Sequence, residues 1–187
     1  KDEAVRGPLR RAVEFASHFM HPDGSYGGEY GSRNTFHFVP HGFELASRFV
    51  PCAAKAADAF LKSLRTGARS YLDDDRIFCH YVYNYLQAYQ DYAPRAESLP
   101  PHPSLSPRGG EGGGEGGSET KFFKEAGLLV RRSGTDYAVI SLSKGGAMKA
   151  FKGEKLVCSD SGLVGVTRGK KKFTSQVVGD FKYEIQK

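Results

Sequence analysis

The chain has 187 residues, a formal net charge of +6 at pH 7 and 39% hydrophobic residues. Its length predicts one or two small domains. The cysteines Cys52, Cys79 and Cys158 form no CxxC pair, which argues against a disulfide framework and against a cysteine-built zinc site. No apolar run reaches the ~20 residues of a membrane span, so we expect no membrane partner.

The first helix is expected to open at Gly7–Pro8, since Pro is tolerated in a first turn, and to stop before His21–Pro22. Asp23–Gly24–Ser25 is a turn signal. The loop that follows, YGGEYGSRNT (Tyr26–Thr35), has glycines that allow positive φ and a close approach of the backbone to a ligand.

Two helices are expected next, at about 41–49 and 51–66, because Pro51 should interrupt the run between them. Gly67 is a suitable residue to end the second helix. The acidic residues Asp73–Asp75 match the N-terminal turn of a further helix through the helix dipole, and that reading competes with a cation site.

The segment Pro94–Ser118 is rich in Pro, Gly and Ser and is predicted to be disordered. It also looks like the translation of an interspersed bacterial DNA repeat. Its GGEGGGEGG run has no Lys-Ser/Thr and no preceding strand, so it does not match a phosphate-binding loop.

Residues 119–187 are predicted to form hairpins that turn at Ser133–Thr135, Gly153 and near Gly169. This part has 14 basic and 7 acidic residues, whereas residues 1–93 have 11 of each. A basic sheet attracts nucleic acid or acidic polysaccharide, and the competing explanation for Lys170–Lys172 is a solvated hairpin tip. The chain starts without Met and stops inside a strand-like run, so we expect a piece of a longer protein.

Two stretches resemble a known family. The run RAVEFASHFMHPDGSYGGEYG looks like a repeat of the α/α-toroid enzymes, with Tyr26 where Trp is usual. The run from Lys124 to Gln176, with its GLLVRRSG and DSG elements, resembles the start of the β-sandwich of heparinase II/III-like polysaccharide lyases. The resemblance implies an α+β multidomain fold: toroid helices in residues 1–93, a linker in 94–118 and a partial antiparallel sandwich in 119–187.

The family acts by β-elimination on acidic polysaccharide, so the resemblance implies that partner and no cofactor. The reaction removes the C5 proton of a uronic acid while its carboxylate charge is offset. A Tyr or His then serves as general base and acid.

The candidate residues are therefore sought around the Gly-rich loop. Arg33 and Asn34 are the first choice for binding the substrate carboxylate, although Asn34 could instead cap a helix and Arg33 could pair with Glu29. The predicted catalytic residues are Tyr30, His37 and His41, and the predicted substrate-binding residues are Glu29, Arg33, Asn34 and His80.

Each candidate has a plainer explanation. Tyr30 could simply pack, as we expect for Tyr26, Tyr81 and Tyr85. His37 and His41 have the i, i+4 spacing of metal ligands, but Pro40 interrupts a helix between them and no HExxH pattern is present, so no metal is predicted.

Three other functions compete with an active lyase. A non-catalytic carbohydrate-binding remnant is the main alternative. A terpene-cyclase type of toroid would need an acidic DxDD string, which Asp73–Arg76 does not match. A nucleic-acid module would need aromatic residues beside the basic ones in a recognition motif, and none is visible.

Overall fold

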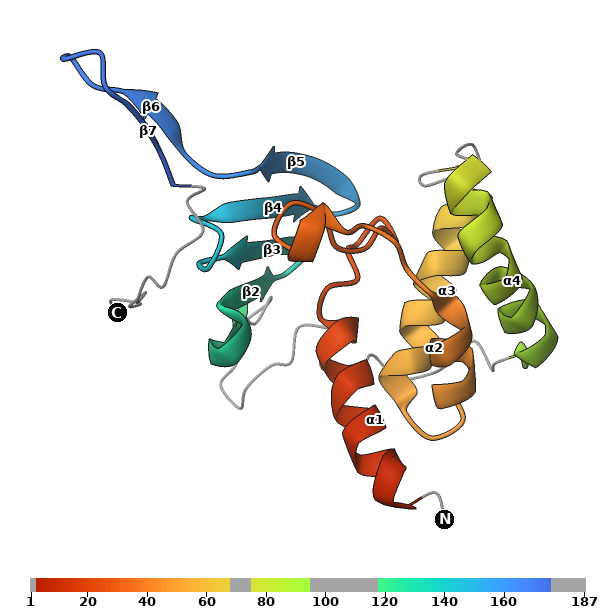
Figure 1. Ribbon diagram of the computed structural model, residues 1–187. Coiled ribbons are helices and arrows are strands. Elements are labelled where there is room, and N and C mark those ends of the chain that lie inside the picture. The colour runs from red at the N-terminus through yellow and green to blue at the C-terminus, as the bar shows by residue number, and fades with distance from the viewer. Residues whose placement is uncertain (1–2, 68–74, 95–117, 176–187) are drawn as a thin grey trace. The chain divides into compact units, whose positions relative to one another are not determined.

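The computed structural model in Figure 1 describes residues 3–67, 75–94 and 118–175. Its contacts divide the chain into two units. A helical unit contains the described parts of Lys1–Tyr26 and His37–Ser106, and a β unit contains Gly27–Phe36 with the described part of Pro107–Lys187. The Gly-rich loop thus belongs with the strands, although helices flank it in the sequence. The fold is α+β.

The helical unit has four described helices, α1 (Glu3–Ser17), α2 (Pro40–Ala46), α3 (Pro51–Arg65) and α4 (Asp75–Asp91). The short α2 packs against both α3 and α4, and α1 packs against α3. Prolines begin α2 and α3, where their missing N–H has no intrahelical partner to lose. Gly67 follows α3 with φ of 66°, so the predicted helix end is confirmed.

The first helix differs from the prediction. It begins at Glu3, and Pro8 lies inside it, in the second turn. Proline removes one intrahelical hydrogen bond, the one that an N–H at position 8 would donate to Ala4, and the helix continues beyond it. It ends at Ser17, before His21–Pro22, as expected.

Two apolar clusters form the core of the helical unit. One joins α1 to the start of α3, and the other surrounds Phe38. The Phe38 ring lies 4.6 Å from Phe43, 5.0 Å from Phe60 and 5.4 Å from Tyr26, measured between centroids. Burial raises the pKa of Tyr26. Tyr26 is therefore a packing residue, as predicted.

The turn at Asp23–Ser25 belongs to this core as well. The Asp23 carboxylate accepts hydrogen bonds from the Ser25 backbone N–H at 2.9 Å and from the Ser25 hydroxyl at 2.6 Å. Gly24 has φ of 80°, and a Cβ there would collide with the Ala59 carbonyl of α3. The motif that resembles toroid enzymes thus docks its own turn onto α3.

The β unit contains a five-stranded antiparallel sheet whose strands follow chain order. They are β1 (Ser118–Phe123), β2 (Leu128–Ser133), β3 (Asp136–Ser141), β4 (Ala147–Lys152) and β5 (Lys155–Asp160). The turns at Gly134 and Gly153, each with φ of 56°, confirm two predicted hairpins. Strand β1 was not predicted, and Ser118 belongs to it rather than to the expected linker.

The third predicted hairpin is also present. Strands β6 (Val164–Val166) and β7 (Lys172–Thr174) form a separate two-stranded ribbon. Lys170 has φ of 61° in the connecting turn, and Lys170–Lys172 are exposed. This exposure agrees with a solvated hairpin tip. Asp73, Asp74, residues 95–117 and the final run of strand-like sequence lie outside the described residues.

One face of the large sheet is buried. Tyr137 and Val139 of β3 lie opposite Phe151 and Lys149 of β4, and all four residues are at most 4% exposed. Arg132 of β2 stacks over the Tyr137 ring at 4.5 Å. A lysine thus occupies a core position among apolar and aromatic side chains. Among the described helices, none is long and apolar enough to cross a bilayer.

Candidate functional site

The Gly-rich loop Gly27–Phe36 forms a closed backbone structure within the β unit. The Gly28 N–H donates to the Thr35 carbonyl at 2.8 Å, and the Gly31 N–H donates to the Gly28 carbonyl at 2.8 Å. A Cβ on Gly27, where φ is 64°, would collide with the Thr35 carbonyl. The loop ends in a 3-10 turn at Ser32–Asn34, with Asn34 in the left-handed region at φ of 54°.

A buried ion pair fastens this loop to the sheet. The Lys149 ammonium lies 3.2 Å from the Glu29 carboxylate; the Lys149 side chain is 5% exposed and that of Glu29 is 34% exposed. Ser159 lies opposite Lys149 in the ladder and also hydrogen-bonds the carboxylate. Burial raises the pKa of Glu29, but a backbone hydrogen bond and the Lys149 and Ser159 contacts outweigh it, so the pKa is lowered overall.

Gly28 makes this approach possible. Its φ is 123°, and a Cβ added there would lie 2.5 Å from the Lys149 nitrogen. Such a conformation is rare for any other residue, and a side chain would displace the ammonium group. The missing side chain of Gly28 therefore allows the close contact with Lys149, which belongs to the same unit.

A second lysine holds the other end of the loop. The Lys144 ammonium donates to the Glu29 carbonyl at 3.2 Å, to the Gly31 carbonyl, and to Asn34 Oδ1 at 3.2 Å. An ammonium has three protons, and these three acceptors match that number. Because Asn34 uses its oxygen here, its amide nitrogen remains available as a donor. Asn34 is exposed, so that donor can reach a ligand in solvent.

Tyr30 and Arg33 are two further predicted site residues in this loop. Tyr30 is only 4% exposed, unlike the exposed Asn34. The side chain of Arg33 lies outside what the structure describes, so the alternative in which it pairs with Glu29 stays untested; the Glu29 carboxylate lies against Lys149.

The predicted histidines belong to the helical unit. His37 precedes α2 and stacks on Tyr81 of α4, with centroids 5.1 Å apart. His41 lies in the first turn of α2, and its Nε2 is 2.8 Å from the Asp91 carboxylate. Because α2 begins at Pro40, the two histidines do not share a helix. Within the described ranges, no three His, Cys, Asp or Glu side chains gather in a metal-binding arrangement.

The fourth helix supplies polar groups that fix α2. The Asn84 side chain, in a residue that is 7% exposed, accepts a hydrogen bond from the His41 backbone N–H at 3.1 Å. It thereby satisfies one of the free N–H groups at the start of α2. Asp91 contacts His41 and also Arg48, at 3.4 Å. His80 is exposed on α4.

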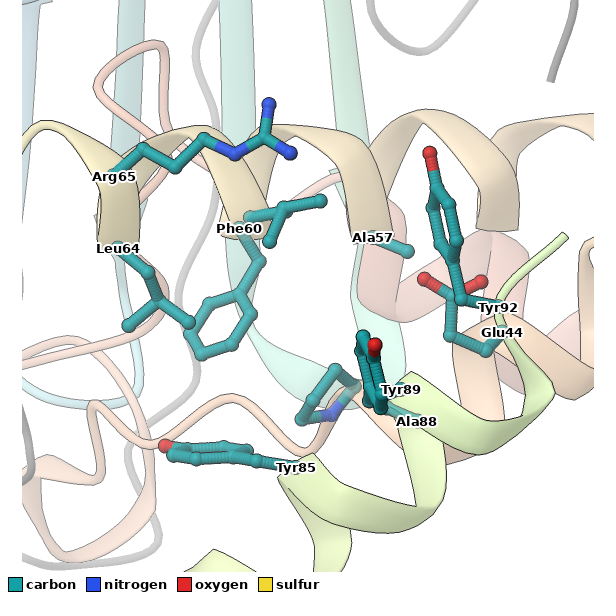
Figure 2. A pocket seen from close by; sticks show the side chains of 11 residues that line it. Glu44, Ala57, Phe60, Leu64, Arg65, Tyr85, Ala88, Tyr89 and Tyr92 are labelled. Atoms are coloured by element: carbon teal, nitrogen blue, oxygen red, sulfur yellow. The ribbon is translucent and has the colours of Figure 1, made fainter. Parts of the chain in front are cut away.

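The helical unit also contains a groove of about 230 Å³ between α3 and α4, with Pro40 and Glu44 of α2 contributing to its lining (Figure 2). Its walls are mostly apolar and aromatic. Glu44 is 6% exposed, and Tyr89 is 81% exposed. No predicted site residue lines this groove.

Sequence reasoning missed Lys144 and Lys149, although one signal pointed to the second. In AMKAF, Lys149 alternates with Ala147 and Phe151 on what must be one face of a strand. A lysine at a core position needs an anionic partner. That partner, Glu29, is 120 residues away in the sequence and could not be identified from spacing.

Comparison with protein-family models gives no match, and comparisons with curated proteins and with solved structures also give no significant match.

Proposed function

We propose that this chain carries substrate-binding groups of an enzyme that cleaves acidic polysaccharide by β-elimination. In this proposal the helices of residues 1–93 are the end of an α/α toroid, and the strands are the beginning of an antiparallel β-sandwich. The proposal is supported by the resemblance of the DGSYGG turn and of the β-part to heparinase II/III-like lyases. It is also supported by the excess of basic residues in 119–187.

The observation that carries the proposal is the contact of Lys144 with Asn34. Lys144 fixes the Asn34 oxygen at 3.2 Å, which leaves the amide nitrogen as an exposed donor beside a cationic group. A uronate carboxylate needs such donors when negative charge builds up during removal of the adjacent proton. Because two lysines fix the loop before any ligand binds, little reorganisation would be required.

The proposed reaction breaks two bonds and forms one double bond. A base removes the C5 proton, the electron pair forms the C4–C5 double bond, and the C4–oxygen bond breaks. The departing oxygen takes a proton from a general acid. Within the β unit, Tyr30 is the candidate for these proton transfers, and Arg33 and Asn34 are the candidates for binding the carboxylate. His37 and His41 belong to the helical unit and stay predictions from the sequence.

The test is the release of unsaturated, ultraviolet-absorbing products from polygalacturonate, alginate and heparin. We expect Asn34→Ala to lower the rate about 10²-fold, the size of effect seen when one donor to a developing anion is removed. Ser143→Ala, at an exposed position next to Lys144, is the matched control and should leave the rate unchanged. Full activity in Asn34→Ala would refute the assignment of this site.

A non-catalytic carbohydrate-binding protein is the second candidate, and two observations favour it. Tyr30 is 4% exposed, and Glu29 is already engaged by Lys149, so two groups of the loop serve its internal structure. Binding of an acidic polysaccharide without any release of unsaturated product would establish this alternative.

A further inference from the structure

The groove between α3 and α4 is lined by aromatic and aliphatic side chains together with two charged ones, Glu44 and Arg65. Its walls come from one stripe of α3 (Ala57, Phe60, Leu61, Leu64 and Arg65), from one stripe of α4 (Tyr85, Ala88 and Tyr89), and from Tyr92, which directly follows α4. From Ala57 to Arg65 the α3 stripe rises about 12 Å along the helix axis, at ~1.5 Å per residue. That length is sufficient for a short saccharide.

Two charged residues, Arg65 and Glu44, are among those that line this groove. Figure 2 shows Arg65 and Leu64 towards one end with Tyr85, and Glu44, Ala57 and Tyr92 towards the other. Phe60 and Tyr85 contact each other across the groove, with ring centroids 5.6 Å apart. The Arg65 side chain runs along α3 so that its guanidinium lies towards Phe60, whereas the buried Glu44 carboxylate lies nearer Ala57 and Tyr92 (Figure 2).

Tyr89 is the second observation that points to a ligand. It lines the groove and yet is 81% exposed, and Tyr92 beside it is 40% exposed. An aromatic ring that borders a pocket with charged side chains offers a flat apolar surface, which suits the C–H face of a pyranose ring. Mostly apolar walls with a few placed polar groups are typical of small-ligand sites.

We propose that this groove binds one uronic acid residue of an acidic polysaccharide. The pyranose ring lies on Tyr89, the uronate carboxylate pairs with the planar Arg65 guanidinium, and Glu44 accepts hydrogen bonds from sugar hydroxyls. Among the described residues that line the groove, Arg65 supplies a positive charge, which a uronate carboxylate complements and a neutral sugar does not. The inference rests on the proposed function only for the chemical class of the ligand.

The experiment is calorimetric titration of the full chain with tetragalacturonate and with its methyl ester, which lacks the carboxylate charge. We expect Tyr89→Ala to weaken binding of both ligands at least tenfold. Tyr83→Ala removes another exposed tyrosine of α4, 58% exposed and outside the groove, and should leave binding unchanged.

Arg65→Gln tests the charge. It should abolish the preference for tetragalacturonate over its ester, whereas Lys62→Gln, which removes the same charge from the last turn of α3 outside the groove, should retain that preference. Unchanged binding in Tyr89→Ala and Arg65→Gln would overturn the inference. Self-association that Tyr89→Ala abolishes would assign the groove to a second copy of the chain and would also overturn it.

These outcomes are distinct from a failure of the proposed function. If unsaturated products are released but the groove variants bind normally, only the groove assignment fails. If neither ligand binds and no product is formed, the acidic-polysaccharide proposal fails as well.

Discussion

Removing either member of the Glu29–Lys149 pair should destabilise the β unit by different amounts. Glu29→Gln leaves a lysine whose side chain is 5% exposed without a counter-charge. Lys149→Met fills the space of the lysine stem with an apolar chain and leaves a carboxylate that is 34% exposed. Water and Ser159 can still solvate that carboxylate. Glu29→Gln is therefore the more harmful change.

The magnitudes follow from burial. Breaking a fully buried pair costs about 3–5 kcal/mol, and the partial exposure of Glu29 reduces this. We expect about 2–3 kcal/mol for Glu29→Gln, where the amide still accepts a hydrogen bond, and about 1 kcal/mol for Lys149→Met. The double variant, which has no charge to leave unpaired, should lie near the Lys149→Met value.

Native-state hydrogen exchange measures these differences in the sheet. At the amides of Val139 and Phe151, on the two strands around the lysine, Glu29→Gln should speed exchange about 30- to 100-fold, since ~1.4 kcal/mol corresponds to tenfold. Lys149→Met should speed it about fivefold. An equal or smaller effect of Glu29→Gln would refute the reasoning that the buried ammonium carries the cost.

Three further outcomes follow. Gly28→Ala should destabilise the protein by about 1–3 kcal/mol in thermal unfolding, because φ of 123° is strained for alanine and the added Cβ would meet Lys149. In the same measurement Gly42→Ala, a control in open space within α2, should stabilise the protein by up to about 1 kcal/mol. Asn84→Ala should cost about 1 kcal/mol by uncapping α2, and the exposed Gln87→Ala on α4 should cost less than 0.5 kcal/mol, both measured by urea unfolding. The pKa of Glu29 is lower in the folded protein, so its stabilising effect is fully present above the unfolded pKa and is lost as pH falls through the folded pKa. Hydrogen exchange in the loop, corrected for its intrinsic pH dependence, should therefore accelerate only under acid conditions. Glu29→Gln should not show this acceleration.

The helix ends and hairpin turns could be predicted from the sequence because proline and glycine determine the backbone conformation of the residues next to them. Pro51 separates two helices, Gly67 ends one of them, and Gly134 and Gly153 turn two hairpins. These effects depend on the allowed φ of one residue, so no tertiary information is needed. Pro8 was misjudged because a helix tolerates the loss of one hydrogen bond beyond its first turn.

The candidate site was less predictable because its contacts join distant parts of the chain. The Gly-rich loop was expected to serve a ligand. In the structure Gly28 leaves room for Lys149 of β4, and the Gly31 carbonyl accepts a hydrogen bond from Lys144, which lies between β3 and β4. The spacing of residues along the sequence does not show which distant residues, such as Glu29 and Lys149, come into contact. Asn84, four residues after His80 on α4, caps α2 through the His41 N–H, another contact between residues that are far apart in the sequence.

Proton exchange at C5 of a bound uronate tests the central claim most directly. In D₂O, the chain is expected to replace the C5 proton of tetragalacturonate with deuterium or to produce the vinyl proton signal of the eliminated product, and Asn34→Ala is expected to do so about 10²-fold more slowly. An unchanged C5 proton signal with the intact chain, under conditions in which the ligand is bound, would contradict the account.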